Sequence, residues 1–144
     1  MVEQASPSAG KAKILVIEDD VFITDLLVKE LTRSGFELMV ATTGGDGAKK
    51  FEEFRPDLIL LDMLLPDQNG LDVLRGIRRL PAGANAKVII FSNIAEEADV
   101  QESKRLGVAD YMVKANYSLP EVVERIRTVL KGDAPSDVQS ATPS

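Results

Sequence analysis

Short apolar runs and longer amphipathic stretches alternate along the chain. The clearest apolar runs lie within Lys13–Ile17 and Leu58–Leu61, and continuous runs of this length are typical of strands that are buried on both faces. Each run is followed by a stretch whose apolar residues recur at helical spacing. The pattern predicts strands at 13–17, 37–42, 58–61, 87–91 and 111–113, and helices around 23–31, 44–54, 70–80, 95–106 and 119–130.

The two predicted helices nearest the end of the chain differ in how clearly they are marked. Before the helix at 119–130, Ser118 and Glu121 form a capping-box pattern, and Pro120 suits the first turn. A continuous apolar stripe then follows. The helix at 95–106 has only a thin apolar face among many charged residues, so we expect it to be the most weakly attached helix.

The regular alternation of strand and helix predicts an α/β fold. We expect a doubly wound, flavodoxin-like, five-stranded parallel sheet in the order 2-1-3-4-5, with helices on both faces. A closed eight-stranded barrel would need roughly twice this length. The strand at 37–42 has less apolar content and is expected at an edge. The domain is expected over 12–132, between a flexible lead at 1–11 and a flexible tail at 133–144.

Composition narrows the possible functions. The chain has a net charge of −6, which disfavours direct binding to nucleic acid phosphates. It contains no cysteine and no histidine, which excludes disulfides, thiolate chemistry, histidine bases and the usual zinc ligands. The apolar runs are too short to cross a membrane, and residues 1–10 lack the apolar core of a signal peptide. We therefore expect a cytoplasmic protein that does not bind membranes.

Polar residues follow four of the five predicted strands. Glu18 and Asp19 come after the first, Asp62 after the third, Ser92 after the fourth and Lys114 after the fifth. In a parallel sheet the carboxyl ends of all strands lie at one edge, where ligands bind. Any one of these residues alone is more readily explained as a turn cap or a solvated charge. Their occurrence at four strand ends together predicts a single site.

The chemistry of these side chains points to phosphoryl transfer. Neighbouring carboxylates repel one another by about 1 kcal/mol or more, and a cation relieves that repulsion. Oxygen ligands without histidine or cysteine favour Mg²⁺ or Ca²⁺, and a three-acid set completed by water and phosphate suits Mg²⁺. Lys114 adds a charge for a phosphoryl oxygen and Ser92 adds a hydroxyl. Asp62 then has the surroundings of a nucleophile that accepts a phosphoryl group.

With these residues in place, the chain resembles the receiver domains of two-component response regulators, of the single-domain chemotaxis-regulator type. The resemblance covers about residues 13–131. The motifs that carry it are Ile14-Leu15-Val16-Ile17-Glu18-Asp19-Asp20, Leu60-Leu61-Asp62-Met63-Leu64-Leu65-Pro66-Asp67-Gln68-Asn69-Gly70, Phe91-Ser92 and Tyr111-Met112-Val113-Lys114.

The resemblance implies a role for each site residue. Asp62 would be the phosphoacceptor. Asp19 would bind Mg²⁺ directly and Glu18 through water, and the backbone carbonyl of Leu64 would be a further ligand. The remaining roles fall to three residues on the later strands: Ser92 and Lys114 would hold phosphoryl oxygens, and Ser92 and Tyr111 would form the switch.

The resemblance also implies partners and a signal. The phosphoryl donor would be a phosphohistidine on a sensor histidine kinase or a histidine phosphotransfer protein. When Ser92 moves toward the phosphate, Tyr111 would turn inward, and the helix at 95–106 would shift and change a surface for protein contact. A homodimer through the last two helices is a further expectation. The tail at 133–144 fits a stand-alone receiver and a linker to another domain equally well.

Four residues depart from or qualify the family pattern. Ala115 stands where the family usually has a proline after the lysine, often with a cis peptide bond. A non-proline cis bond costs about 3 kcal/mol, so a trans bond or a strained loop is expected. Asn93 replaces a small residue and would narrow access to the phosphate. Leu64 and Ile94 cannot orient an attacking water, so slow self-dephosphorylation is expected.

Three other interpretations compete with a phosphorylated receiver. A phosphohydrolase of the haloacid dehalogenase type would need a second acid where Leu64 stands. A flavodoxin-like cofactor binder would need a phosphate-cradling loop after the first strand, where Glu18 and Asp19 would repel phosphate. A degenerate receiver that serves only as a scaffold would fold in the same way but would not become phosphorylated.

Overall fold

The computed structural model describes residues 11–132, so the segments expected to be flexible lie outside it, apart from Lys11. Five parallel strands form one sheet in the order β2-β1-β3-β4-β5, which confirms the predicted topology and the edge position of β2. The strands are β1 (Lys13–Ile17), β2 (Glu37–Ala41), β3 (Leu58–Leu61), β4 (Val88–Ser92) and β5 (Asp110–Val113). The helices are α2 (Val21–Arg33), α3 (Gly44–Phe54), α4 (Gly70–Arg79), α5 (Glu97–Arg105), the 3-10 helix η1 (Lys114–Asn116) and α6 (Leu119–Leu130).

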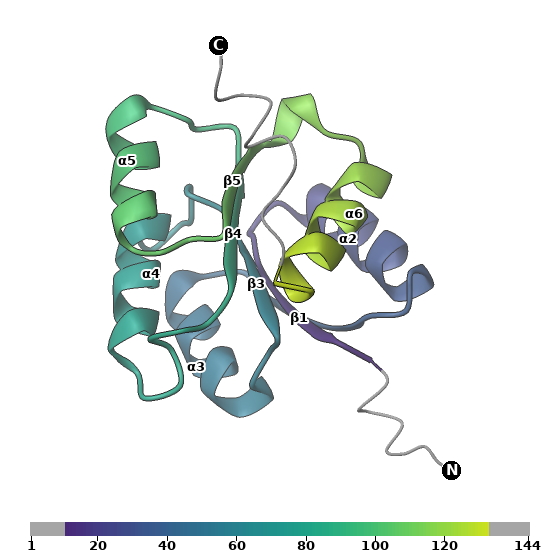
Figure 1. The fold of residues 1–144 in the computed structure, drawn as a ribbon, viewed down its shortest axis with the longest axis horizontal. Helices are drawn as coiled ribbons and strands as arrows, with labels where there is room; N and C mark the ends of the chain where they lie inside the picture. Colours follow the sequence, from purple (N-terminus) through teal and green to yellow (C-terminus); the bar gives the residue numbers. More distant parts are fainter. Residues whose placement is uncertain (1–10, 133–144) are drawn as a thin grey trace.

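The sheet is covered by helices on both faces, with α2 and α6 on one side and α3, α4 and α5 on the other (Figure 1). Successive strand residues point to opposite faces, and the two cores follow that alternation. Ile14 and Val16 of β1 pack in the layer under α2 and α6. Leu15 and Ile17 pack in the layer under α3 and α4. A strand covered on both faces must be apolar at every position, which explains the unbroken runs.

Two of the element boundaries that differ from the sequence prediction lie on either side of the loop after β4. β4 extends to Ser92, because Ser92 still pairs in register with Val113 of β5, whereas the apolar run stops at Phe91. The helix expected at 95–106 begins only at Glu97, because Glu96 has an extended backbone with a ψ of 145°. Both differences arise where the chain leaves the sheet edge, and there the apolar pattern carries no further information.

The helices α5 and α6 are attached to the sheet very differently. α6 has the predicted capping box between Ser118 and Glu121 and buries Val122, Val123, Ile126 and Val129. α5 buries only Ser103, whose hydroxyl donates to the Val100 carbonyl at 2.7 Å. The expectation that this helix has the weakest apolar attachment is therefore confirmed.

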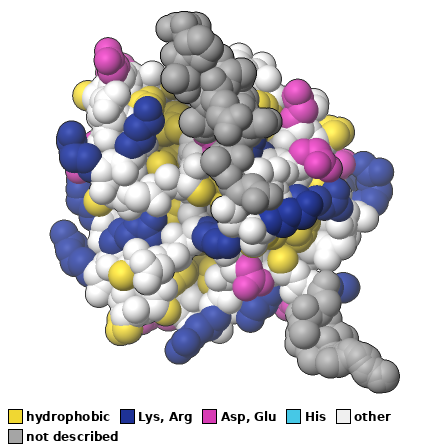
Figure 2. All heavy atoms as spheres, viewed as in Figure 1, with side chains coloured by type: hydrophobic (Ala, Val, Ile, Leu, Met, Phe, Trp, Pro, Cys, Tyr) yellow, Lys and Arg dark blue, Asp and Glu magenta, His cyan; other side chains and the backbone are white. Residues whose placement is uncertain are grey.

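The surface carries charges of both signs. Lys, Arg, Asp and Glu side chains are spread among apolar and uncharged atoms on the face seen in Figure 2. Within residues 11–132, the helices are all too short or too polar to cross a lipid bilayer.

Candidate functional site

Three strands end in a buried polar residue at the carboxyl edge of the sheet. The exposed fractions are 2% for Glu18, 6% for Asp62 and 1% for Ser92. The backbone ladder continues past the apolar runs, because the Glu18 amide donates to the Ala41 carbonyl at 2.9 Å and the Asp62 amide to the Ile17 carbonyl at 3.0 Å. The sheet itself therefore fixes the two buried acids next to each other.

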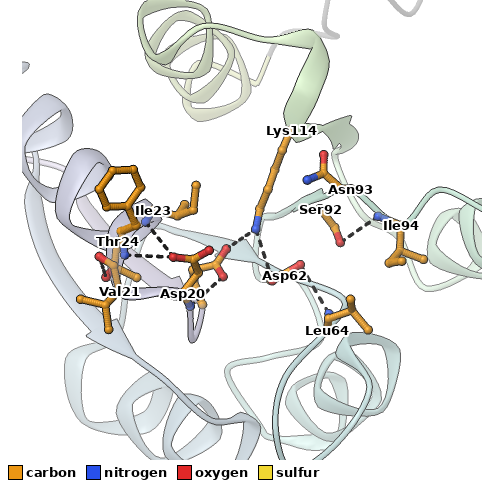
Figure 3. A network of polar contacts seen from close by, with 12 residues as sticks. Asp20, Val21, Ile23, Thr24, Asp62, Leu64, Ser92, Asn93, Ile94 and Lys114 are labelled. Atoms are coloured by element: carbon orange, nitrogen blue, oxygen red, sulfur yellow. Dashed lines mark hydrogen bonds and ion pairs between the residues drawn. The ribbon is translucent and has the colours of Figure 1, made fainter.

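Lys114, which directly follows β5, contacts both of these acids. Its Nζ donates to Glu18 Oε1 at 2.6 Å and to Asp62 Oδ2 at 3.4 Å, and it also lies 5.9 Å from the centre of the Phe91 ring. Figure 3 shows the Lys114 side chain pointing toward Asp62. Residues far apart in the sequence, including those predicted from the strand ends, thus meet in one pocket.

Asp19 and Asp20 follow Glu18 but are used differently. Asp19 is exposed at the mouth of the pocket, and it offers an oxygen that lies within 4.8 Å of oxygens from Glu18 and Asp62. Asp20 is the N-cap of α2, where its Oδ1 accepts from the Phe22 amide at 2.9 Å. The acidic run therefore divides into two residues whose oxygens cluster with those of Asp62 and one that lines the pocket but caps a helix.

The buried ion pair changes the acidity of its members. Burial raises the pKa of Glu18 to about 7, although the Lys114 hydrogen bond opposes the change. Burial alone would lower the pKa of Lys114, but its contacts with Glu18 and Asp62 outweigh that and raise it. The Lys114 ammonium thus contacts both acidic side chains at once.

The loop after β3 holds Asp62 close to the backbone of α4. The Gly70 amide donates to the Met63 carbonyl at 2.8 Å. A Cβ at Gly70 would lie 2.5 Å from the Asp62 carbonyl oxygen, so only glycine allows this close approach. Leu64, 63% exposed, donates its amide to Asp62 Oδ1 at 3.4 Å. The turn after β3 therefore requires a glycine where the chain returns to the backbone of Asp62.

Asp67 anchors the same loop to the start of α3. Its carboxylate accepts from the amides of Gly44 at 2.8 Å and Gly45 at 3.0 Å. These two hydrogen bonds hold the pKa of Asp67 below its ordinary value. This aspartate was not identified as a site residue from the sequence, and it acts on the pocket through the shape of the loop.

Ser92 and Tyr111 both contact the segment that follows β4. Ser92 Oγ accepts from the Ile94 amide at 3.3 Å. The Tyr111 hydroxyl donates to the Ile94 carbonyl in a short hydrogen bond. Burial, followed by the negative charges of Asp99 and Asp62, raises the pKa of this half-buried tyrosine to about 12. Ile94 thus connects the two residues that were expected to form a switch, a contact that the sequence did not reveal.

Asn93 and Ala115, two of the four positions that depart from or qualify the family pattern, contact each other. Residues 11–132 contain no cis peptide bond, so the bond from Lys114 to Ala115 is trans. The Ala115 amide donates to Asn93 Oδ1 at 3.1 Å. The sequence gives each departure separately but carries no sign that they form a pair.

The donor set of the pocket fits a hard divalent cation. Glu18, Asp19 and Asp62 supply carboxylate oxygens, and the described residues that line the pocket include no imidazole, thiolate or thioether. Oxygen-only sets of this kind suit Mg²⁺, Mn²⁺ or Ca²⁺. The pocket is open to solvent beside Leu64, Pro66 and Asn93, so water and a phosphoryl group can enter.

Comparison with known proteins finds relatives of similar sequence. The chain is 31% identical over 120 residues to the chemotaxis protein CheY of Thermotoga maritima, a match that covers 83% of this chain and 98% of the relative. It is also 32% identical to the DNA-binding response regulator MtrA of Mycobacterium tuberculosis, covering 90% of this chain but 56% of that protein.

Solved structures agree with this comparison. A CheY-like receiver domain protein from Methanospirillum hungatei aligns with a TM-score of 0.79 and 28% identity, covering 85% of this chain and 95% of that one. A chain of the CheX-CheY-BeF3-Mg²⁺ complex from Borrelia burgdorferi aligns with a TM-score of 0.76 and 25% identity, covering 85% of this chain and 92% of that one. Residues 14–127 match the response regulator receiver domain as a family. A match over most of the sequence, on a sheet with this strand order and this acidic edge, shows that the chain belongs to the response regulator receiver domain family of two-component signalling proteins.

Proposed function

We propose that the chain accepts a phosphoryl group on Asp62 from a phosphohistidine of a sensor histidine kinase or a histidine phosphotransfer protein. The observation that carries this proposal is the position of the Lys114 ammonium, 2.6 Å from Glu18 and 3.4 Å from Asp62. This position supports the proposal, because it brings the Lys114 ammonium, the Asp62 carboxylate and the acidic cluster with Glu18 and Asp19 to one open pocket.

Glu18, Asp19, Asp62 and the backbone carbonyl of Leu64 would hold Mg²⁺ in this pocket. When bound, Mg²⁺ supplies positive charge that screens the carboxylates and draws in the phosphoryl oxygens. Two related structures support a divalent cation, since one contains Mg²⁺ with BeF3 and another, of the response regulator Rcp1, contains Mn²⁺.

The transfer itself needs little more than positioning by this chain. An Asp62 carboxylate oxygen attacks phosphorus, and the P–N bond of the donor breaks with its electron pair returning to the imidazole nitrogen. Lys114 already lies within 3.4 Å of Asp62 Oδ2, so its ammonium can move to an incoming phosphoryl oxygen. Ser92 Oγ accepts from the Ile94 amide, which leaves its own proton free to donate to the phosphoryl group.

The signal would pass through the segment that joins β4 to α5. A phosphoryl group adds about −1.5 to −2 charge at the pocket. Movement of Ser92 toward it would release the Ile94 amide, and Tyr111, bonded to the Ile94 carbonyl, would turn inward. Because α5 buries only Ser103, it is the helix that follows with least loss of packing. The output is a changed surface for a protein partner, and a homodimer through α5 and α6 is one form it could take.

The phosphorylated form should be long-lived. Leu64 is 63% exposed beside Asp62, and Ile94 lies close to Ser92. Neither side chain can hydrogen-bond a water for attack on the acyl phosphate. Replacing both, with Leu64→Asn and Ile94→Glu, should therefore shorten the lifetime of phosphorylated protein. An unchanged decay rate in that double variant would overturn this part of the proposal.

Phosphodonor labelling tests the proposed acceptor. Incubation with acetyl phosphate and Mg²⁺ should add the mass of one phosphoryl group, and removal of Mg²⁺ with EDTA should prevent it. Asp62→Asn should abolish labelling, whereas Asp25→Asn, at an exposed aspartate of α2, should leave it unchanged. Labelling that persists in Asp62→Asn would contradict the proposal. No labelling of the unaltered protein would favour the scaffold interpretation.

A further inference from the structure

We propose that Asn93 is a positioning residue for phosphoryl binding, which it supports by linking the segment that carries Ser92 to the segment that carries Lys114. This inference rests on the proposed function, because Ser92 and Lys114 are the residues expected to hold the phosphoryl oxygens. The link is the hydrogen bond from the Ala115 amide to Asn93 Oδ1 at 3.1 Å.

The bond lies just beyond the last rung of the sheet. β4 and β5 remain in register up to the pair Ser92 and Val113. After that rung the two chains diverge, one toward α5 and the other into η1. The contact between Asn93 and Ala115 is the next link between them, and it spans the point of divergence. It therefore fixes the relative position of the residues immediately before each partner, which are Ser92 and Lys114.

The position of Asn93 at the pocket supports a role in binding. Asn93 lines the same pocket as Asp62, Ser92 and Lys114, and Figure 3 shows it beside the Lys114 side chain. Its side chain is exposed, so the bond adds little apolar burial that would give it a general role in stability. A side chain that is exposed, yet bonded across two loops at the rim of a site, acts mainly on the geometry of that site.

Each partner of the bond requires the other. Ala115 can donate because it has a backbone N–H, whereas proline at this position would have none. Asn93 can accept because its amide reaches across the gap, whereas alanine or glycine there would offer no side-chain acceptor. Asn93 also brings no negative charge to a pocket that already holds Glu18 and Asp62. The hydrogen bond therefore needs both residues, and replacing Asn93 by alanine or Ala115 by proline is expected to remove it.

The equilibrium affinity for beryllofluoride in the presence of Mg²⁺ tests this inference. Beryllofluoride is a suitable probe because an equilibrium constant does not depend on how easily a donor enters past Asn93. Asn93→Ala should weaken its binding by roughly two- to tenfold, the range expected for loss of one hydrogen bond. Ala115→Pro should have a similar effect, and the double variant should be no weaker than the weaker single variant. Mg²⁺ affinity without beryllofluoride should stay unchanged in Asn93→Ala.

Hydrogen exchange and urea denaturation, each with a matched control variant, separate positioning from a structural effect. Hydrogen exchange of the Ala115 amide in the metal-free protein should speed up in Asn93→Ala and return toward the original rate in Asn93→Asp, which keeps an acceptor oxygen. Asn116→Ala, at an exposed asparagine of η1, should change neither exchange nor affinity. The urea midpoint of Asn93→Ala should match that of Asn116→Ala.

The outcomes distinguish this inference from the proposed function. If the unaltered protein binds beryllofluoride and Asn93→Ala binds it equally well, the positioning role is wrong and the proposed function stands. The role is also wrong if the losses of the two single variants multiply in the double variant. If the unaltered protein does not bind beryllofluoride with Mg²⁺ at all, the proposed function fails and this inference fails with it.

Discussion

The interior of the sheet and its carboxyl edge are built from the same strands, but the interior buries apolar side chains and the edge buries acidic ones. In the interior, Ile17 and Leu61 are fully buried among apolar neighbours. One residue further along, Glu18 and Asp62 are almost as deeply buried but carry carboxylates. Burial of apolar side chains stabilises the fold, whereas burial of neighbouring acids opposes it. The interior therefore supplies stability, whereas the edge keeps two buried acidic side chains in contact with a single ammonium.

The helices repeat this contrast. α6 packs four buried side chains onto the interior, while α5 follows the edge and buries only Ser103. α5 is held instead by polar contacts from α4, including an ion pair between Arg75 and Glu102 at 3.2 Å. Apolar burial is lost gradually as a helix moves, but a hydrogen bond or ion pair is lost within about an ångström. A helix held by a few directional contacts can therefore take up a second position when those contacts exchange.

Ile126→Ala tests the interior side of the comparison and should have the largest effect on stability. Ile126 is fully buried in the layer under α2 and α6, so the free energy of unfolding should fall by about 3 kcal/mol. Urea denaturation measures this, with Gln101→Ala on the exposed side of α5 as the control that should change little. Labelling of the remaining folded protein by acetyl phosphate should persist. A loss for Gln101→Ala as large as that for Ile126→Ala would contradict the contrast between the helices.

Arg78→Gln tests whether polar contacts hold the end of α5. The Arg78 guanidinium donates to the carbonyls of Leu106 at 2.8 Å and Gly107 at 3.1 Å and to two carbonyls of the loop at 81–86. Burial lowers its pKa, but these bonds need the charged form. Glutamine cannot reach all four acceptors, so we expect a loss of about 2 kcal/mol in unfolding free energy. Arg79→Gln, at the exposed neighbour, should lose far less in the same urea experiment.

Glu18→Gln tests the cost of charge at the edge through its pH dependence. Because the pKa of Glu18 is raised from 4.5 to about 7 in the folded protein, the unfolded chain releases its proton first as the pH rises. The free energy of unfolding of the metal-free protein should therefore fall between about pH 4.5 and 7, by on the order of 1–2 kcal/mol, and level off above pH 7. Glutamine should remove this slope. Equal slopes in both proteins, measured by urea denaturation in EDTA, would show that Glu18 is not the group responsible.

The same proton should oppose metal binding. A carboxylate must be ionised to bind a cation, so Mg²⁺ affinity should increase as the pH rises through about 7, where Glu18 loses its proton. A titration of Mg²⁺ followed by isothermal calorimetry at several pH values measures this. The affinity of Glu18→Gln should be weaker and nearly independent of pH over that range.

Much of the interior and part of the edge could be predicted from the sequence, because both are encoded by neighbouring residues. An apolar run marks a strand, and the polar residue that ends it, such as Asp62, marks the edge. Parallel topology then brings Glu18, Asp62 and Ser92 together whatever lies between them. This is why the meeting of these residues at one edge of the sheet could be predicted from the sequence.

The contacts beyond the last rung of the sheet could not be predicted in the same way. η1 was not expected, because Lys114, Ala115 and Asn116 show no helical pattern of their own. The bond between Asn93 and the Ala115 amide depends on how two loops diverge after the sheet ends. Loop backbones follow no periodic pattern, so contacts that depend on their paths are available only from the three-dimensional structure.

The smallest expected effect concerns the ion pair that joins α4 to α5, and it sharpens the comparison most. Arg75 Nη2 lies 3.2 Å from Glu102 Oε2, and both side chains are partly exposed. Hydrogen bonds from Arg105 and then Arg75 lower the pKa of Glu102, so the pair is ionised at neutral pH. Glu102→Gln should reduce the urea midpoint slightly at low salt, and the difference should vanish near 1 M salt, where the Debye length is about 3 Å. The core variant Ile126→Ala should keep its full difference at both salt concentrations, because apolar burial is not screened. If Glu102→Gln were as insensitive to salt as Ile126→Ala, α5 would be attached to α4 by packing, and the difference between the two helices would disappear.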